Sequence, residues 1–494
     1  MNMRITGTGF LRQAEVVSRL REALPEASVL SDPEDTRPYE CDGLTAYRAT
    51  PGVVALPANE DEVREVLRIC HQLKIPVVAR GAGTGLSGGA LPLPDGVLLS
   101  LAKMNRIIAL DPISRTARVQ PGVRNLAISE AASDFGLYYA PDPSSQIACS
   151  IGGNVAENSG GVHCLKYGLT VHNVLRVRAL SVEGEPLEIG SAAFDSPGFD
   201  LLALITGSEG MLAVITEVTV KLLPRPEFAR CVLASFDAVV TAGNAVANVI
   251  ASGIIPAGLE MMDKPMARAV EPFVNAGYPL DAEAILLAES DGTPEEVAEE
   301  IARISEVMRS SGATEVRVSQ SEAERLLFWA GRKAAFPAIG RISPDYYCMD
   351  GTIPRKRLAE VLSGIAAMEK KYGLRCANVF HAGDGNLHPL IMYDANVEGE
   401  LARAEEFGGE ILELCVALGG TITGEHGVGV EKIDQMCVQF SPAELDMFHA
   451  VKRAFDPHSL LNPGKAVPTN HRCAELGRMH VRGGKLPFPD LPRF

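Results

Sequence analysis

The sequence predicts an α+β protein with more than one domain, from its length and from two contrasting regions. A chain of 494 residues exceeds what a single hydrophobic core supports, so we expect two or three domains. Up to about residue 225, glycine-rich stretches are interspersed with short β-rich segments. From about residue 229, strand and helix patterns alternate, which favours a two-layer, ferredoxin-like α+β unit.

The composition is that of a globular protein whose charge argues against nucleic acid as a partner. Hydrophobic residues make up 46% of the chain and charged residues 22%. The net charge of −16 disfavours nucleic acid and anionic membrane surfaces. Ten cysteines include no CxxC pair, which argues against an iron–sulfur cluster in this chain and fits a reducing compartment. With no signal peptide or transmembrane segment expected, we predict a cytoplasmic protein, peripheral to the inner face of the membrane only through partners.

The first region contains two glycine-rich stretches that predict an anion cradle. A helix is expected over 59–74, where Asn59 and Glu62 form a capping box. The strand "IPVVAR" then leads into "GAGTGLSGG" (81–89). This stretch matches G-x-G-x-x-G, but the prolines of "ALPLPDG" forbid the helix that a Rossmann fingerprint needs. We interpret it and "SIGGNVAENSGG" (150–161) as loops that bind a diphosphate through backbone N–H groups, although tight surface loops are the alternative.

The second region alternates elements as a cap domain would. The uncharged run 238–259 predicts a helix followed by a strand rather than a membrane span. Strands are expected at 230–236, 257–262, 283–289, 313–318, 346–353 and 376–393, and helices at 237–252, 294–310, 321–335 and 398–418.

A hairpin with two histidines is the candidate metal site. In "NVFHAGDGNLHPL" (378–390), Asp384 and Gly385 predict a two-residue turn, which would pair His381 with His388. Their Cβ atoms would then lie about 5 Å apart on one face, although a structural pair of histidines fits the hairpin equally well. The segment "GEHGVG" adds Glu425. A His₂Glu set suits a catalytic zinc ion, with Fe²⁺ or Mn²⁺ as alternatives.

Together these motifs resemble one flavoprotein superfamily. They are "RGAGTGLSGG", "VQPGV", "PDP", "SIGGNVAENSGG", "GSEGMLAVIT", "WAGRKAAFP", "NVFHAGDGNLHP", "TGEHGVG" and "LLNPGK". The chain resembles the vanillyl-alcohol-oxidase/PCMH superfamily, in its D-2-hydroxyacid dehydrogenase branch, and within it the FAD-linked subunits of bacterial glycolate oxidases. The resemblance implies a two-lobed PCMH/VAO-type FAD-binding domain (1–225), a ferredoxin-like cap domain for substrate and metal (226–450), and a C-terminal segment that returns to the FAD domain (451–494).

The resemblance also implies where FAD binds. Some superfamily members attach the flavin to a histidine in the first glycine loop, where this chain has Thr84, so we expect non-covalent FAD. The implied FAD contacts are Arg80, Gly81, Ala82, Gly83, Thr84, Gly85, Leu86, Ser87, Gly88, Pro141, Asp142, Pro143, Ser150, Ile151, Gly152, Gly153, Asn154, Asn158, Gly161, Glu209, Gly210, Ile215 and Asn462.

Roles in catalysis follow from the same resemblance and from the chemistry of hydroxy-acid oxidation. The hydroxyl must lose its proton while the α-hydrogen passes as hydride to flavin N5, and a divalent cation lowers the hydroxyl pKa. His426 is the candidate base, although a turn histidine bonded to backbone is the alternative. Arg332 is expected to bind the substrate carboxylate, or otherwise only to answer the helix dipole. Cys348 stands where relatives that take diacids have a lysine, which favours glycolate or D-lactate.

The electron acceptor lies outside this chain. The resemblance implies a complex with a sibling FAD-domain subunit and an iron–sulfur subunit that deliver electrons to the respiratory chain. A single-chain FAD-dependent D-lactate dehydrogenase is the alternative. Two further readings are a metal hydrolase, which bound flavin would contradict, and a non-catalytic flavin-fold subunit, which predicts decayed metal and base positions.

Overall fold

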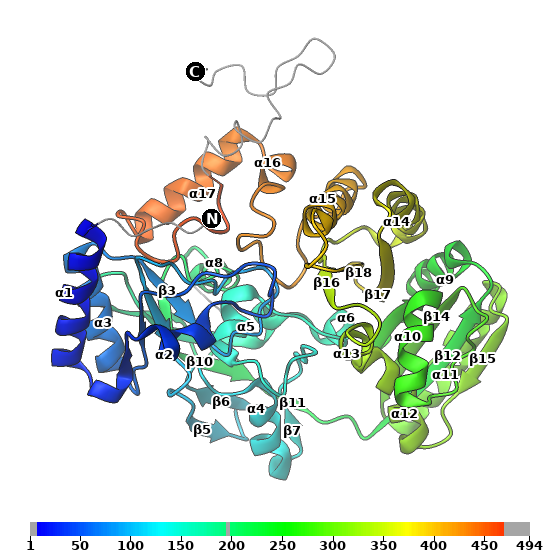
Figure 1. Ribbon diagram of the computed structural model, residues 1–494. Coiled ribbons are helices and arrows are strands. Elements are labelled where there is room, and N and C mark those ends of the chain that lie inside the picture. Colours follow the sequence, from blue (N-terminus) through cyan, green and yellow to red (C-terminus); the bar gives the residue numbers. More distant parts are fainter. Residues whose placement is uncertain (1–6, 194–197, 469–494) are drawn as a thin grey trace.

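The computed structural model describes residues 7–193 and 198–468, which form two halves built on separate sheets. A four-stranded and a five-stranded sheet lie in the N-terminal half, and a seven-stranded antiparallel sheet forms the C-terminal half (Figure 1). This arrangement confirms the predicted α+β class. Within the described residues, no helix is both long and apolar enough to cross a membrane.

The four-stranded sheet carries the first glycine loop. Its order is β1 (Val29–Leu30), β2 (Val53–Ala55), β4 (Val97–Ser100) and β3 (Val77–Arg80), with β2, β4 and β3 parallel. Helix α3 (Glu60–Leu73) begins as predicted, because the Asn59 side chain accepts the N–H of Glu62. Val63, Val66 and Leu67 of this helix are buried with α1 (Gly7–Ala23) against the sheet. The glycine loop that follows Arg80 therefore starts from a strand that is fixed in a packed sheet.

The five-stranded sheet packs against the second glycine-rich stretch. Ser150 precedes helix α5 (Ile151–Glu157), so the predicted loop was wrong over these residues. Gly152 allows the close packing, because a Cβ there would lie 2.6 Å from Cβ of Pro121. The strands, in order, are β5 (Ile107–Asp111), β6 (Thr116–Val119), β10 (Val214–Lys221), β8 (Val174–Leu180) and β9 (Pro186–Gly190); β7 (Leu137–Tyr138) pairs with β11 (Leu223–Pro224), and the other helices are α2 (Pro33–Thr36), α4 (Asn125–Ala132), α6 (Cys164–Tyr167), α7 (Thr170–Asn173) and α8 (Leu201–Ile205).

The C-terminal half is a ferredoxin-like unit with a three-stranded extension. Strands β12 (Phe228–Phe236), β13 (Gly258–Asp263), β14 (Ala284–Gly292) and β15 (Glu315–Val318) are arranged β15-β12-β14-β13, and β17 (Arg375–His381), β18 (Asn386–Tyr393) and β16 (Asp345–Cys348) continue the sheet. Both faces are covered, as the core clusters show. One face packs on α9 (Val239–Ala251), α11 (Pro294–Ser310), α14 (Leu358–Tyr372) and α15 (Glu400–Ala417), and the other on α10 (Lys264–Val274), α12 (Glu322–Lys333) and α13 (Ala335–Ile339).

The hairpin register differs from the predicted one. His381 pairs with Asn386 and His388 pairs with Val379, so the loop has four residues rather than two. The N–H of Gly383 donates to β13, which prevents it from pairing across the hairpin. The shift is by an even number of residues, so both histidines stay on one face, with ring centroids 5.0 Å apart.

The C-terminal helix α17 (Pro442–Phe455), with α16 (Met436–Gln439) before it, returns to the N-terminal half (Figure 1). The buried Lys452 donates to the carbonyls of Met211 and Leu461 and to the carboxylate of Asp456. Leu461 in turn bridges to Val77 of β3. One buried ion pair thus helps to hold the segment after α17 on the first sheet.

Replacing Asp456 with alanine should destabilise the protein strongly. The variant leaves the Lys452 ammonium buried without its counter-ion, which costs about 3–5 kcal/mol. Thermal unfolding measures the effect. Asp446→Ala on the exposed side of α17 is the control and should change stability by less than about 0.5 kcal/mol. Equal unfolding midpoints for the two variants would contradict the role given to this pair.

Candidate functional site

A single cavity of about 380 Å³ connects the glycine-rich segments to the histidine hairpin. The predicted FAD contacts occupy one part of its wall, and His388, Glu425 and His426 occupy another. Lys333, Phe336 and Pro337 line it as well. The predicted contacts that line it are Arg80, Gly81, Ala82, Gly83, Thr84, Gly85, Leu86, Pro143, Ser150, Gly152, Gly153, Asn154, Glu209, Gly210 and Ile215.

The remaining predicted FAD contacts do not line the cavity, and several of them form hydrogen bonds with the segments around it. Asn462 donates to the carbonyls of Gly89 and Glu209, so it ties the C-terminal segment to the cavity rim. Asp142 accepts from the backbone N–H of His163, and the side chain of Asn158 accepts from the N–H of Val171. The predicted contacts that do not line the cavity are Ser87, Gly88, Pro141, Asp142, Ile151, Asn158, Gly161 and Asn462.

The glycine-rich part of the cavity fits a polar cofactor. The Ser150 hydroxyl lines the cavity and is buried without a hydrogen-bond partner. A Cβ on Gly81 would lie 2.1 Å from that hydroxyl, so only glycine permits this approach. An unpartnered hydroxyl donor beside glycine backbone suits the oxygens of a diphosphate or a polar edge of the flavin ring.

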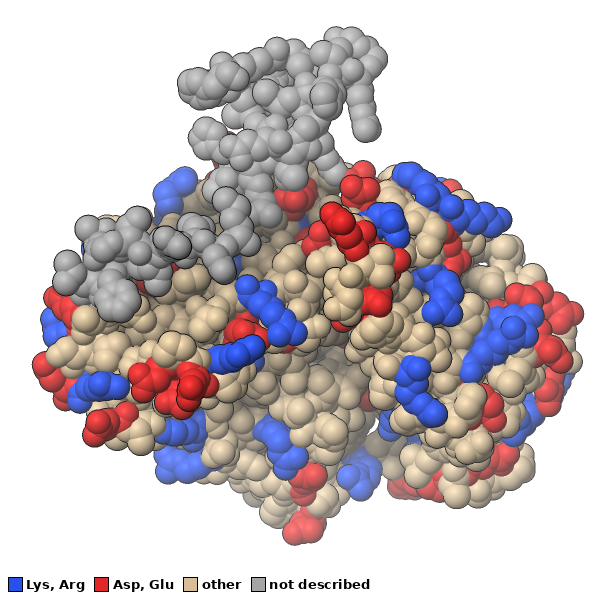
Figure 2. All heavy atoms as spheres, viewed as in Figure 1, with Lys and Arg blue, Asp and Glu red and all other residues tan. Residues whose placement is uncertain are grey.

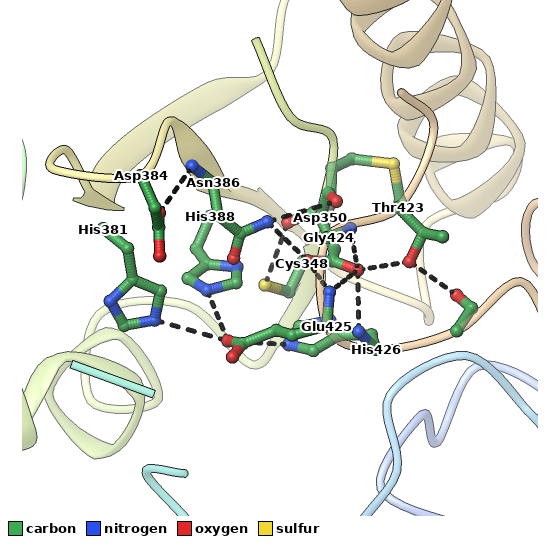
Figure 3. A network of polar contacts seen from close by, with 12 residues as sticks. Cys348, Asp350, His381, Asp384, Asn386, His388, Thr423, Gly424, Glu425 and His426 are labelled. Atoms are coloured by element: carbon green, nitrogen blue, oxygen red, sulfur yellow. Dashed lines mark hydrogen bonds and ion pairs between the residues drawn. The ribbon is translucent and has the colours of Figure 1, made fainter. Parts of the chain in front are cut away.

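The predicted metal ligands are brought together. His388 Nε2 lies 2.9 Å and His381 Nε2 3.3 Å from Glu425 Oε1 (Figure 3). On the other side of the ring, His381 Nδ1 lies 2.7 Å from Glu260 Oε1. The ligand atoms of His381, His388 and Glu425 all lie within 4.8 Å of one another. Glu260 thus orients His381 from behind, as carboxylates do at metal-binding histidines.

The charges around this cluster suit a cation. Burial by itself would lower the pKa of His381, but the carboxylates of Glu260 and Glu425 raise it well above the ordinary value. Burial would raise the pKa of Glu425, but the histidines hold it well below its usual range. The carboxylates around His381 therefore stabilise a positive charge, here as a proton on the ring. A divalent cation would replace that proton, so the residues fit a metal ion.

Asp350 organises the loop that carries Glu425 and His426. Its fully buried carboxylate accepts the backbone N–H groups of Gly424, Glu425 and His426, at 2.8 to 3.2 Å. Lys432 donates to it at 3.2 Å. Burial opposes ionisation, but His426 and Lys432 hold the pKa of Asp350 below its ordinary value. No motif in the sequence pointed to this residue.

His426 lies against His388 with parallel rings, their centroids 5.0 Å apart. Its Nε2 lies 3.9 Å from Glu425 Oε1, and its Nδ1 is buried without a partner. Burial lowers the pKa of His426 to about 4, aided by the charges of His388 and Lys432 and opposed by Asp350. The imidazole is therefore neutral near pH 7, as a general base must be.

Arg332 lies at the cluster but does not line the cavity. Helix α12 begins at Glu322, within the helix expected over 321–335, and the side chain of its N-cap Ser321 accepts the N–H of Glu324. The guanidinium is buried, its Nε donates to Glu260 at 2.5 Å, and its Nη2 lies 3.4 Å from His381 Nδ1. The next residue, Lys333, reaches the cavity wall.

Comparison with known proteins places the chain in a family. Residues 51–190 match the FAD binding domain model, and residues 225–466 match that of the FAD linked oxidases, C-terminal domain. Over 482 residues the chain is 64% identical to the glycolate oxidase subunit GlcD of Escherichia coli (strain K12), covering 98% of this chain and 97% of that protein. The chain belongs to the FAD-linked oxidases. The predicted superfamily is thereby confirmed, and the protein is an FAD-dependent oxidoreductase.

More distant relatives share this architecture. The D-lactate dehydrogenase of Anaerostipes hadrus is 33% identical over 461 residues, covering 91% of this chain and 97% of that protein. A solved structure of p-cresol methylhydroxylase with substrate bound superposes with a TM-score of 0.79 at 17% identity, covering 94% and 98% of the two chains. At that identity, the likeness concerns the fold of this FAD-linked oxidase.

Two acidic residues of this FAD-linked oxidase line the cavity next to the predicted FAD contacts. Glu209, a predicted contact, accepts the N–H groups of Val428 and Gly429, both at 2.7 Å, although burial raises its pKa. Glu157 was missed by the sequence analysis. One oxygen of its carboxylate is buried without a partner, and burial raises its pKa well above the ordinary value. No sequence signal distinguishes it from the exposed glutamates of other short helices.

Asp350→Asn should loosen the loop from Thr423 to Gly427. The amide keeps the size of the side chain but removes the charge that holds three backbone N–H groups and Lys432. We expect faster hydrogen exchange of the amides at 424–426, read by mass spectrometry. The control, Asp345→Asn, changes an aspartate of β16 that accepts the Ala395 N–H and should leave these amides unchanged. Unaltered exchange in Asp350→Asn would contradict the organising role.

Proposed function

We propose that this FAD-linked oxidase oxidises a small 2-hydroxy acid, with glycolate as the substrate, to the 2-oxo acid. The observation that carries the proposal is the one cavity that joins the glycine-rich cradle to His388, Glu425 and His426. A hydroxy acid placed between them would present its α-carbon to the flavin side and its oxygens to the cluster. The 64% identical relative is named a glycolate oxidase subunit.

The two bound groups would supply complementary chemistry. FAD would be held non-covalently by the lining residues 80–86, 150, 152–154, 209–210 and 213–215, and it would supply the hydride acceptor. A divalent cation, held by His381, His388 and Glu425, makes an alcohol more acidic. Zinc is our first choice from the ligand set, with Fe²⁺ and Mn²⁺ as alternatives.

The residues of the chain then bind the substrate and take its proton. We propose that Nε2 of neutral His426, the ring nitrogen on the Glu425 side, accepts the hydroxyl proton. Arg332 is proposed to bind the carboxylate. Its Nε already binds Glu260, but a guanidinium has five N–H donors, and Nη2 lies at the cluster. Cys348 in place of a longer basic side chain favours a monocarboxylate.

Electrons must leave the reduced flavin for an acceptor outside this chain. We propose a complex with a sibling FAD-domain subunit and an iron–sulfur subunit, because the 64% identical relative is named a subunit and this sequence has no CxxC pair. On the face drawn in Figure 2, basic and acidic side chains are interspersed, as a protein-binding surface allows and a nucleic-acid surface does not favour.

Glycolate should bleach the yellow flavin absorbance of the purified protein under anaerobic conditions. Removing metal with a chelator should slow the bleaching, and re-adding Zn²⁺, Fe²⁺ or Mn²⁺ should restore it and rank the three metals. L-Lactate serves as the control substrate of opposite configuration to D-lactate. A protein that binds no FAD, or whose flavin ignores every 2-hydroxy acid, would overturn the proposal.

D-Lactate is the second candidate substrate, since a 33% identical relative is named D-lactate dehydrogenase. Reduction by D-lactate at a rate above that of glycolate would favour this alternative. Isolation of the protein from native membranes as a single chain, with no further subunits bound, would favour it as well.

His426→Gln should lower the rate of flavin reduction about 10²- to 10⁴-fold, because glutamine cannot take the proton. In the unaltered protein, the low pKa of His426 keeps its lone pair available as pH falls, so flavin reduction should show no loss centred near pH 6.5, where an ordinary histidine titrates. Stopped-flow reduction between about pH 5 and 8 measures both. His71→Gln, on α3, is the control. A full rate in His426→Gln would exclude His426 as the base.

A further inference from the structure

A second group of possible metal ligands adjoins the first. The ligand atoms of Cys348, His388 and His426 lie within 4.8 Å of one another. Cys348, the last residue of β16, is 4% exposed, and Figure 3 shows its sulfur beside the His388 ring. The group contains a thiol and two imidazoles, which is a different donor chemistry from that of His381, His388 and Glu425.

Each imidazole of this group has one ring nitrogen without a hydrogen-bond partner. His388 is 3% exposed, and while its Nε2 faces Glu425, its Nδ1 is buried without any hydrogen-bond partner. Nδ1 of His426 is also buried and without a partner. A buried imidazole nitrogen normally has a partner, so the two unpartnered nitrogens on the rings of this group need an explanation.

We propose that Cys348, His388 and His426 form a second metal site, which takes a thiophilic divalent cation such as Zn²⁺ or Cd²⁺. The cation replaces the thiol proton of Cys348 and accepts the lone pairs of the two Nδ1 atoms. Where His388 also binds the first cation through Nε2, its remaining ring proton is released as well, and the released protons pass to solvent. A Cys/His/His set prefers zinc-like ions, whereas the His₂Glu set also suits Mn²⁺ and Fe²⁺.

Occupation of this second site would inhibit the enzyme, and this part rests on the proposed function. A cation at Nδ1 of His426 leaves the ring proton on Nε2, which is the nitrogen proposed to accept the substrate proton. His388, shared by the two sites through different nitrogens, would also be drawn away from Glu425. Excess zinc would then inhibit an enzyme that needs one divalent ion.

X-ray absorption of the FAD-loaded protein tests the binding without any activity measurement. The full chain is stripped with a chelator, loaded with Cd²⁺ or Zn²⁺ to saturation, and compared with Cys348→Ser. We expect a metal–sulfur shell, at about 2.3 Å for zinc, that Cys348→Ser abolishes, together with the loss of one bound equivalent in equilibrium dialysis. Cys376→Ser, which removes another buried thiol from the same sheet, is the control and should retain both signals.

Each outcome decides a separate point. A saturated protein with only nitrogen and oxygen neighbours, or a sulfur shell that persists in Cys348→Ser, overturns the second site. A sulfur shell without inhibition of glycolate oxidation by excess zinc overturns the inhibitory role. We expect the zinc concentration for half-inhibition to rise at least tenfold in Cys348→Ser, each protein being measured against its own uninhibited rate. A protein that fails to oxidise glycolate but shows the sulfur shell contradicts the proposed function and not the site.

Discussion

The candidate site depends on two buried carboxylates, one from each half of the molecule, that hold a single loop. Asp350 of the cap accepts the N–H groups at 424–426, and Glu209 of the FAD-binding half accepts those of Val428 and Gly429. Neither carboxylate has significant access to solvent, so each needs these donors to remain ionised. The loop therefore cannot move relative to either half without exposing or orphaning a charge, and Glu425 and His426 are carried between them to the cavity.

The orientation of the proposed metal ligands depends on a buried carboxylate behind them, that of Glu260. Glu260 on β13 binds both Arg332 and His381, which aims the other nitrogen of His381 at Glu425. The hairpin that carries His381 and His388 is itself held by the Gly383 contact to β13. A change in β13 would thus affect the proposed metal ligands without altering them directly, because the strand supplies both the orienting carboxylate and the anchor of the turn.

The sequence predicted the elements whose signals are local. The capping residues Asn59 and Ser321 start helices where expected, and the predicted helix over 294–310 coincides with α11. The hairpin register could not be predicted, because it depends on a hydrogen bond from Gly383 to β13, which is more than a hundred residues away in the chain. Asp350 was missed for the same reason: its partners are distant in sequence, and "DGT" carries no local signal of their approach.

In the two proposals, Cys348 bears on both substrate size and metal chemistry. A lysine there would place an ammonium beside His388 and His426, which would repel a cation and bind a second carboxylate of a diacid instead. The thiol removes that charge and adds a soft donor within 4.8 Å of both rings. Under the two proposals, the thiol that suits a small monocarboxylate would also accept a thiophilic metal, so substrate specificity and zinc sensitivity would be coupled properties of the same residue.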